Sequence, residues 1–371
     1  HFISIGGWIN AIIPILIVPY YSVIGGWVIK YLIEYFAGHS KTLAGDAYFT
    51  TFISNGWSTE ICFIIFTLFT LGIIYAGVRN GIERVSKFMM PILIVLSLII
   101  AVYSVTRPGA IEGVKYFLVP NFDHFSWMTV VSAMGQMFYS LSIAMGILIT
   151  FGSYMKKDTS IEKSTENVEI FDTAIAIMAG LMIIPAVFAF SGGNAETLKS
   201  GPALMFITIP KVFANMGFGT AIGVVFFLLV LFAAVTSSIA LTESAVSTFE
   251  DELHWSRKKS TVFMGMVMLL LGTLSCLGYG PLANFKILGM QFLDFFDFIT
   301  NSVMMPIAAI ATCLLVSKVV GVDKIEEEIK KDGQVFRRKK IFCFMIKYLC
   351  PLFAAIILIS SVANAFGIIT M

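Results

Sequence analysis

Nine long apolar segments, separated by short polar connections, constrain the fold of this chain more than any other feature of its sequence. A helix needs about 20 consecutive apolar residues to cross the hydrocarbon core of a bilayer. Only 13% of the residues are charged, whereas soluble domains carry about 25%. The sequence therefore predicts an all-α polytopic membrane protein, with spans at about 8–37, 58–78, 88–106, 127–154, 167–190, 216–250, 260–278, 288–316 and 342–368.

Basic residues are concentrated in every second connection between these spans. The sixth connection carries Arg257, Lys258 and Lys259, and the eighth carries eight basic residues between positions 318 and 340. Because Lys and Arg gather on the cytoplasmic side of a membrane, the even-numbered connections are predicted to be cytoplasmic. We therefore expect a multi-pass protein of the cell membrane that starts inside the cell and has an extracytoplasmic C-terminus.

Two of the connections contain structure of their own. The eighth, at 320–340, is predicted to form a short cytoplasmic helix and a loop. The fifth, at 191–215, is external and rich in apolar residues. An exposed loop gains nothing from such residues, so we expect it to pack into the external face; a helix lying at the lipid interface is the alternative.

Several functional classes lack support in the residues. The five cysteines form no CxxC pattern and the four histidines are scattered, so no transition-metal site is predicted. No nucleophile, histidine and acid occur in a catalytic arrangement, and no enzyme activity or organic cofactor is expected. The net charge of +2 gives no indication of a nucleic-acid partner.

Polar residues interrupt the fourth span, 127–154, at its centre. Gln136, Ser140 and Ser142 lie between Gly135 and Gly146. A weak point in a membrane helix is tolerated where it faces protein or an aqueous cavity, and transporters use broken helices of this kind to bind substrates and ions. An ordinary helix that uses Ser and Gly for close packing remains the alternative.

Other polar groups lie within apolar spans. Asp172 is a candidate functional residue because an unpaired intramembrane carboxylate is costly; a helix-entry Asp near the interface is its alternative. The neighbouring hydroxyls of Thr236 and Ser237 can contribute oxygen ligands to a sodium ion, although such hydroxyls often bond to their own backbone. Tyr20 and Tyr21 follow Pro19, and deeply placed phenols need hydrogen-bond partners.

Acidic residues occur at the ends of two spans. Glu250, Asp251 and Glu252 lie at the cytoplasmic end of one span, where the helix dipole disfavours acids. We therefore expect a cationic partner from elsewhere in the protein. Asp294 and Asp297 lie at the external start of the span 288–316, where the dipole favours acids.

Five motifs in this order resemble the neurotransmitter:sodium symporter family, in particular its bacterial amino-acid transporters with eleven spans. They are Gly81-Ile82-Glu83-Arg84-Val85-Ser86-Lys87-Phe88-Met89-Met90-Pro91, Gly135-Gln136-Met137-Phe138-Tyr139-Ser140-Leu141-Ser142, Ser153-Tyr154-Met155-Lys156-Lys157-Asp158, Thr236-Ser237-Ser238 and Phe249-Glu250-Asp251-Glu252-Leu253. The resemblance implies an inverted-repeat fold with broken helices. It also implies sodium-coupled symport of a small amino acid by alternating access.

The resemblance also implies roles for individual residues. The implied substrate-binding residues are Ile17, Tyr21, Tyr139, Ser142, Ala144, Met145 and Leu241, an apolar and aromatic set that favours a hydrophobic or aromatic amino acid. The implied sodium ligands are Ser140 and Asp172 at one site and Ala233, Thr236 and Ser237 at a second. Asp297 resembles the external gate acid and Asp251 the internal one. Because Asp172 carries its own negative charge, transport is expected to be independent of chloride.

The chain differs from the family in lacking counterparts of its first two spans. We interpret residues 1–371 as a single transporter domain that covers spans three to eleven, is truncated at its N-terminus and does not transport alone. A homodimer is compatible with the resemblance. A proton-coupled transporter of the same fold, through Asp172, and a non-transporting membrane subunit remain alternatives.

Overall fold

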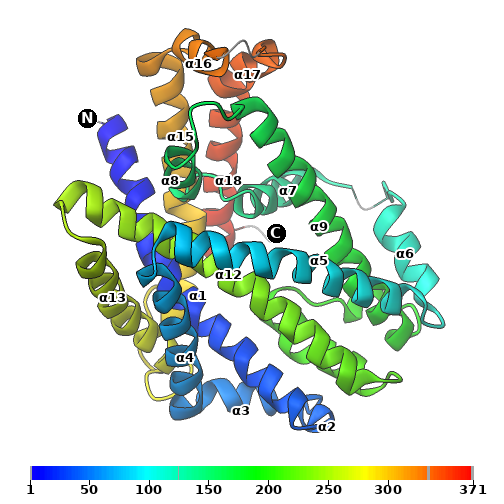
Figure 1. Cartoon of the computed structure of the whole chain (residues 1–371). Helices are drawn as coiled ribbons and strands as arrows, with labels where there is room; N and C mark the ends of the chain where they lie inside the picture. The colour runs from blue at the N-terminus through cyan, green and yellow to red at the C-terminus, as the bar shows by residue number, and fades with distance from the viewer. Residues whose placement is uncertain (1, 124, 332–334, 369–371) are drawn as a thin grey trace.

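Helices form nearly all of the regular structure in the computed structural model, which describes residues 2–123, 125–331 and 335–368 (Figure 1). Within these residues there is no strand, and Ile287 and Met290 form an isolated bridge. Eight helical stretches are long and apolar enough to cross a membrane. They are α1 (Phe2–Phe36), α4 (Gly56–Tyr75), η1 with α5 (Val78–Glu83, Arg84–Val105), α9 (Ile161–Ser191), α12 (Gly219–Leu253), α13 (Arg257–Leu277), α14 to η5 (Phe292–Asp297, Phe298–Met304, Met305–Leu314, Leu315–Val320), and α17 to α18 (Lys339–Phe344, Met345–Leu349, Cys350–Ala365).

Shorter helices lie in the connections. They are α2 (Ser40–Leu43), α3 (Tyr48–Ser54), α6 (Ala110–Leu118), η2 (Ala195–Thr197), α10 (Gly201–Ala203), η3 (Leu204–Thr208), α11 (Ile209–Ala214) and α16 (Val322–Ile329). The helix α16 confirms the helix predicted within 320–340; residues 332–334 of that segment lie outside the described residues.

The fourth predicted span, 127–154, is not a continuous helix. It consists of α7 (Trp127–Ser140) and α8 (Ile147–Ser153), with a non-helical break between them. Ser142 and Ala144 adopt φ of 54° and 59° in the break, a left-handed conformation that costs a non-glycine residue about 1–2 kcal/mol. The break predicted from the polar centre of this span is therefore confirmed, and it lies after Ser140.

The break is held in place by α1 and α12. Gly146 has φ of 72°, and a Cβ on it would lie 2.8 Å from Ser244 Oγ and 3.1 Å from the Asn10 carbonyl oxygen. Because Pro14 has no N–H to donate, the Asn10 carbonyl lacks its helical partner. A glycine is therefore required both for the backbone conformation and for the close approach of α8 to these two helices.

The long helices α1 and α12 cross the molecule diagonally and pack against each other (Figure 1). The helices α4, α13 and α15 also pack on α1, and Tyr20, Tyr31 and Tyr35 of α1 are almost fully buried. Burial of side chains of this size removes a large apolar area from water or lipid. The core of the molecule is therefore built around α1.

Residues 191–215 pack into the helical bundle, as expected for this apolar connection. Phe206 is 1% exposed and stacks on Phe49, with ring centroids 5.2 Å apart. Its carbonyl accepts a 2.7 Å hydrogen bond from the Tyr31 hydroxyl. These contacts confirm the packed alternative and contradict a helix that lies only at the lipid interface.

The start of α9 differs from the predicted boundary at residue 167. The Ser160 side chain accepts a hydrogen bond from the Lys163 N–H and begins the helix at Ile161. The charged first turns of α9 are stabilised because Arg338 pairs with Glu166 at 3.3 Å and with Glu169 at 2.9 Å. Hydropathy alone placed the start too late, since these turns are polar yet helical.

Candidate functional site

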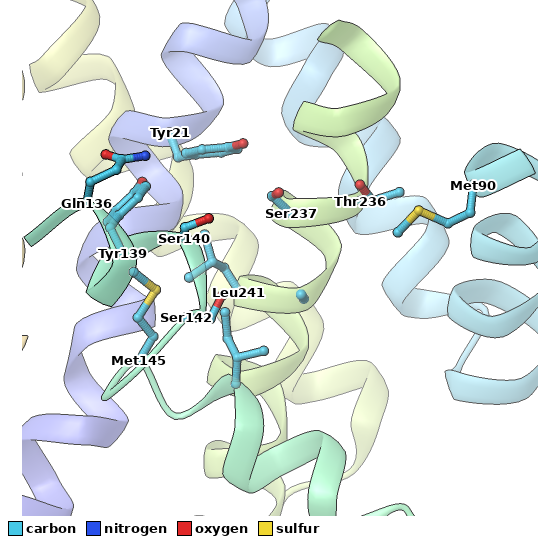
Figure 2. Close-up of a pocket in the computed structure, with 12 residues that line it drawn as sticks. Tyr21, Met90, Gln136, Tyr139, Ser140, Ser142, Met145, Thr236, Ser237 and Leu241 are labelled. Atoms are coloured by element: carbon cyan, nitrogen blue, oxygen red, sulfur yellow. The ribbon is translucent and has the colours of Figure 1, made fainter. Parts of the chain in front are cut away.

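A cavity of about 440 Å³ lies where the break between α7 and α8 faces α1 and α12 (Figure 2). Helix α5 contributes to it from a further side. The residues that line it are Tyr21, Met90, Gln136, Tyr139, Ser140, Ser142, Met145, Ile147, Thr236, Ser237, Ala240 and Leu241. Eight of these were singled out from the sequence: Tyr21, Tyr139, Ser142, Met145 and Leu241 for substrate, and Ser140, Thr236 and Ser237 for sodium.

The cavity combines aromatic, apolar and hydroxyl groups. The Tyr21 ring extends from α1 with its hydroxyl toward Ser237 on α12 (Figure 2), and both side chains line the cavity. Tyr139 belongs to α7 and lines the cavity from that helix. Because α7 ends at Ser140, the chain beyond it turns and brings Ser142 and Met145 to the same cavity. The combination can hold an apolar group beside polar groups that fix its orientation.

The Thr236 hydroxyl donates to the carbonyls of Ala233 at 3.0 Å and Phe232 at 3.1 Å. This bonding to the helix's own backbone is the alternative considered from the sequence. It does not exclude a cation, because a hydroxyl that donates its proton keeps oxygen lone pairs as acceptors. The Thr236 oxygen can therefore serve as a cation ligand.

Asp172 is joined to the cavity through Ser140. The Ser140 hydroxyl donates a 2.6 Å hydrogen bond to Asp172 Oδ1, although 32 residues separate them in the chain. Ser140 ends α7, and Asp172 lies on α9 three turns after its start. The contact places a carboxylate directly behind the broken segment, where it can contribute charge to a cation bound there.

Three other predicted residues do not line this cavity. Ile17 is fully buried in the core, one turn before Tyr21 on α1. Ala144 lines a neighbouring cavity on the other side of the break. The Ala233 carbonyl accepts a hydrogen bond from the Thr236 hydroxyl. Ile17 and Ala144 therefore lie behind the wall and do not contact the cavity directly.

The candidate external gate acid, Asp297, ends α14. Its carboxylate accepts a 3.1 Å hydrogen bond from the Tyr20 hydroxyl and a 2.5 Å hydrogen bond from Asn301 Nδ2. Tyr20 neighbours Tyr21 in the chain, so this network connects α14 to the wall of the cavity. Asp297 therefore has neutral partners within the described residues.

The candidate internal gate acid, Asp251, is exposed and lines a second cavity of about 490 Å³, together with Ser4 and Trp8 of α1. Within the described ranges Asp251 forms no ion pair. The cationic partner expected for the acids at 250–252 is present for Glu250 only, which lies 3.4 Å from Arg257. Arg257 begins the next helix, α13, so it is a near neighbour in sequence.

The sequence interpretation missed Glu243, the main partner of Arg257. Its side chain is fully buried and lies 2.5 Å from Arg257 Nη2, and it accepts a 2.7 Å hydrogen bond from the Tyr154 hydroxyl. Arg257 also donates to the Ile74 carbonyl at 2.9 Å. A carboxylate within the apolar stretch around Leu241 was the signal that could have revealed this junction of α4, α8, α12 and α13.

Four residues that line the first cavity had no predicted role: Met90, Gln136, Ile147 and Ala240. Gln136 lay in the interrupted span and could have been proposed from its polarity. The positions of Met90, Ile147 and Ala240 depend on helix packing, which apolar residues in apolar spans do not reveal. Among the described residues no group of three His, Cys, Asp or Glu side chains gathers into a metal site.

Comparison with known proteins identifies relatives along almost the whole chain. The model of the sodium:neurotransmitter symporter family matches residues 47–368. The uncharacterized sodium-dependent transporter YhdH of Bacillus subtilis is 32% identical over 98% of this chain and 80% of its own length. The Drosophila melanogaster sodium- and chloride-dependent GABA transporter ine is 25% identical over 80% of this chain and 32% of its own.

A solved structure shares the fold. The crystal structure of MhsT in complex with L-phenylalanine superposes with a TM-score of 0.84 and 32% sequence identity, covering 97% of this chain and 81% of that one.

Proposed function

The chain belongs to the sodium:neurotransmitter symporter family, and we propose that the complete protein couples a sodium gradient to the uptake of a hydrophobic or aromatic amino acid, without a requirement for chloride. It is a multi-pass, sodium-dependent transporter with the fold of this family, and not an enzyme. The observation that carries the substrate proposal is the cavity at the helix break, where Tyr21, Tyr139, Met145 and Leu241 surround a space lined by hydroxyls.

The proposed substrate position follows from the chemistry of this wall. The Tyr21 hydroxyl donates to the substrate carboxylate, while the side chain lies against Met145 and Leu241. A charged side chain would lose its hydration there without a buried partner, which is costly. The phenylalanine bound by MhsT, a relative of the same fold, supports an apolar substrate of this size.

Two sodium positions are proposed at the cavity. Ser140 and Asp172 form one, and the Ala233 carbonyl with the Thr236 and Ser237 hydroxyls forms the other. Hard cations prefer oxygen ligands, and both sets offer only oxygen. The Asp172 carboxylate provides a fixed negative charge at the first position, which is the reason to propose chloride independence.

Alternating access is proposed to depend on Asp297 and Asp251 as gate acids on opposite sides of the cavity. Sodium and substrate together shift the balance between outward-open and inward-open states by their differential affinity for the two. The C-terminus is proposed to be extracytoplasmic, and a homodimer is compatible with the proposal.

Uptake by the protein expressed from its complete gene and reconstituted in proteoliposomes tests the proposal. Labelled phenylalanine, leucine, lysine and glutamate are offered with an inward sodium gradient, a potassium control, and gluconate in place of chloride. Sodium-driven uptake of phenylalanine or leucine, unchanged in gluconate, is expected. A pH-driven uptake that ignores sodium would select proton coupling instead, and a chloride requirement would contradict the role of Asp172.

Substitutions then assign the ion sites. Ser237→Ala and Asp172→Ala are each expected to abolish sodium-driven uptake. Thr173→Ala is the matched control, because its hydroxyl donates to the Glu169 carbonyl within α9. Equal loss of uptake in the control would show that the effect comes from α9 as a whole.

A further inference from the structure

Sulfur atoms gather in a second cavity, which lies on the other side of the helix break from the candidate substrate site. This cavity of about 440 Å³ is enclosed by α7, α15 and the stretch from η7 to α18. Its lining includes five sulfur-bearing residues: Met134, Met137, Cys313, Met345 and Cys350. Two thiols and three thioethers around one space are an unusual concentration for a wall of only thirteen residues.

The two thiols are direct neighbours. Cys313 of α15 and Cys350, the first residue of α18, are both free, and both line this cavity with their side chains close enough to interact. The two helices pack against each other. Cys313 is 6% exposed and Cys350 is half-buried, so the Cys313 thiol is the more enclosed of the two.

Hard-cation ligands are almost absent from this wall. Among its lining residues Thr312 alone has a side-chain oxygen, and none has a carboxylate, an imidazole or an ammonium group. Thiolate and thioether ligands select soft ions such as copper(I), whereas sodium, magnesium and calcium require oxygen. Structural zinc takes four ligands in a closed tetrahedron, and in these sites the ligands are cysteine and histidine.

We propose that this cavity is a binding site for a soft monovalent cation of the copper(I) type, held between the sulfur atoms of Cys313 and Cys350, with methionine thioethers of the same wall as further donors. Linear coordination needs only two sulfur donors, and two cysteines and three methionines line this cavity. The site is distinct from the sodium positions, which use oxygen ligands on the opposite side of the break.

The apolar wall determines the protonation state of the bound form. When the cation binds, one cysteine releases its proton to water and binds as the thiolate, and methionine thioethers of the wall donate the neutral lone pairs that complete the coordination. One positive charge enters and one leaves, so the complex is neutral. A second deprotonation would leave a net negative charge among apolar side chains, which is costly.

The site would also affect the broken segment. Ala144 lines the sulfur cavity, whereas Ser142 and Met145 line the candidate substrate cavity. A cation bound to Cys313 and Cys350 would therefore occupy a cavity that the broken segment helps to form. This consequence rests on the proposed function; the binding of the cation does not.

Silver(I) is the probe for the test, because it has the charge and the sulfur preference of copper(I) and is stable in air. The purified protein in detergent is equilibrated with silver nitrate in a chloride-free buffer, desalted against a weak thioether competitor, and analysed for bound metal. About one silver ion per chain is expected to be retained. Zinc under the same wash should not be retained.

Cysteine variants test whether Cys313 and Cys350 bind the silver ion. Cys313→Ser and Cys350→Ser should each weaken silver binding by about tenfold or more, since even changes around metal ligands cost that much. A protein with Cys62→Ala, Cys276→Ala and Cys343→Ala keeps the pair and should bind as the parent does. Equal retention by the double Cys313→Ser, Cys350→Ser protein would overturn the proposal, as would zinc retained through the same two thiols.

A measurement without variants guards against misfolding of the mutant proteins. Silver should protect Cys350 of the unmodified protein from a small maleimide, as read by mass spectrometry of the peptide that contains it. Labelling of Cys350 that silver leaves unchanged would contradict the assignment. Because neither measurement involves transport, failure here is distinguishable from failure of the proposed symport.

Discussion

The hydrogen bond between Ser140 and Asp172 is the most specific polar contact at the broken segment, at 2.6 Å. Asp172→Asn keeps the size of the side chain but removes its charge. Because the lost charge would lie beside the bound cation, and changes around metal ligands cost about 10–100-fold in affinity, we expect sodium affinity to fall by about tenfold or more. Sodium titration of substrate binding measures this change. An unchanged sodium affinity would show that Asp172 is only a packing residue.

Individual candidate residues could be predicted where a polar side chain occurs within an apolar span. Gln136, Ser140 and Asp172 were visible as polar groups in apolar spans, and the structure brings Ser140 and Asp172 into contact. Ile17 and Ala144 were assigned by resemblance alone, and both lie behind the cavity wall. The distance of a side chain from a cavity depends on helix rotation by fractions of a turn, which sequence periodicity does not fix.

The Glu243 carboxylate and the Arg257 guanidinium form the most buried ion pair in the described structure, at 2.5 Å. Glu243→Gln removes the negative charge and leaves Arg257 with Glu250 and the Ile74 carbonyl. Removal of one partner of a buried pair costs about 3–5 kcal/mol, and we expect the lower end of this range. The measurement is the thermal unfolding midpoint of the purified protein, which should fall by several degrees.

Glu252→Gln is the matched control for this prediction, since Glu252 is an exposed acid on the same helix end. Its unfolding midpoint should stay close to that of the parent. Equal midpoints for both variants would show that Arg257 is sufficiently held by Glu250 and Ile74.

The close contact between α1 and α4 depends on Gly26. A Cβ at this position would lie 2.6 Å from the backbone nitrogen of Phe63 and 2.8 Å from the carbonyl carbon of Cys62. Because both are backbone atoms, the helices themselves must separate. Overpacking of this kind costs about 1–3 kcal/mol, so Gly26→Ala should lower the unfolding midpoint.

Gly72→Ala serves as its control, because a Cβ at Gly72 of α4 meets nothing within 4 Å. Alanine there should stabilise the helix by up to about 1 kcal/mol. If the two alanine variants shift the midpoint in the same direction, the contact at Gly26 is not what limits the approach of the helices.

The loop before α3 is attached to α11 by the ion pair of Asp46 with Lys211. Lys211 lowers the pKa of the Asp46 carboxyl below its ordinary value. The pair therefore stabilises the folded loop above about pH 4, the ordinary pKa of Asp. This stabilisation is lost as the pH falls through the lowered pKa of Asp46. Hydrogen-exchange protection of residues 44–47, corrected for intrinsic rates, should drop over this acid range. Lys211→Gln should remove the pH dependence; if it persists, another group causes it.

The elements themselves were largely predictable because hydropathy is decisive in a membrane. Eight of the nine predicted spans are continuous helices, and the polar centre of the fourth marked its break. Boundaries were wrong where helices extend into polar sequence, as at Ile161, where a Ser160 cap and not hydropathy decides the start. The π-helical turns, such as Val78–Glu83, were not predicted, since they arise from packing rather than from a local pattern.

The molecule as a whole is recognisable from five short motifs, and the fold they implied agrees with that of a solved relative at a TM-score of 0.84. The order of the spans and the position of the break followed from the sequence. Glu243 and Arg257 lie 14 residues apart on consecutive helices, and Tyr154 joins them from a distant part of the chain. The buried carboxylate was visible in the sequence, but its partner Tyr154 was not, because a hydropathy pattern does not specify which helices are neighbours.

The orientation of the whole molecule in the membrane is a separate prediction, which rests on the distribution of basic residues. If the eighth connection is cytoplasmic and the fifth is external, Lys324 and Lys199 lie on opposite sides of the bilayer. Both lysines are exposed, so Lys324→Cys and Lys199→Cys form a matched pair of reporters. In intact cells a membrane-impermeant maleimide should label Lys199→Cys only, and Lys324→Cys should react after permeabilisation. The parent protein, with its five native cysteines, sets the background. The reverse pattern would place the basic connections outside, and both the extracytoplasmic C-terminus and the assignment of Asp297 as the external gate would then be wrong.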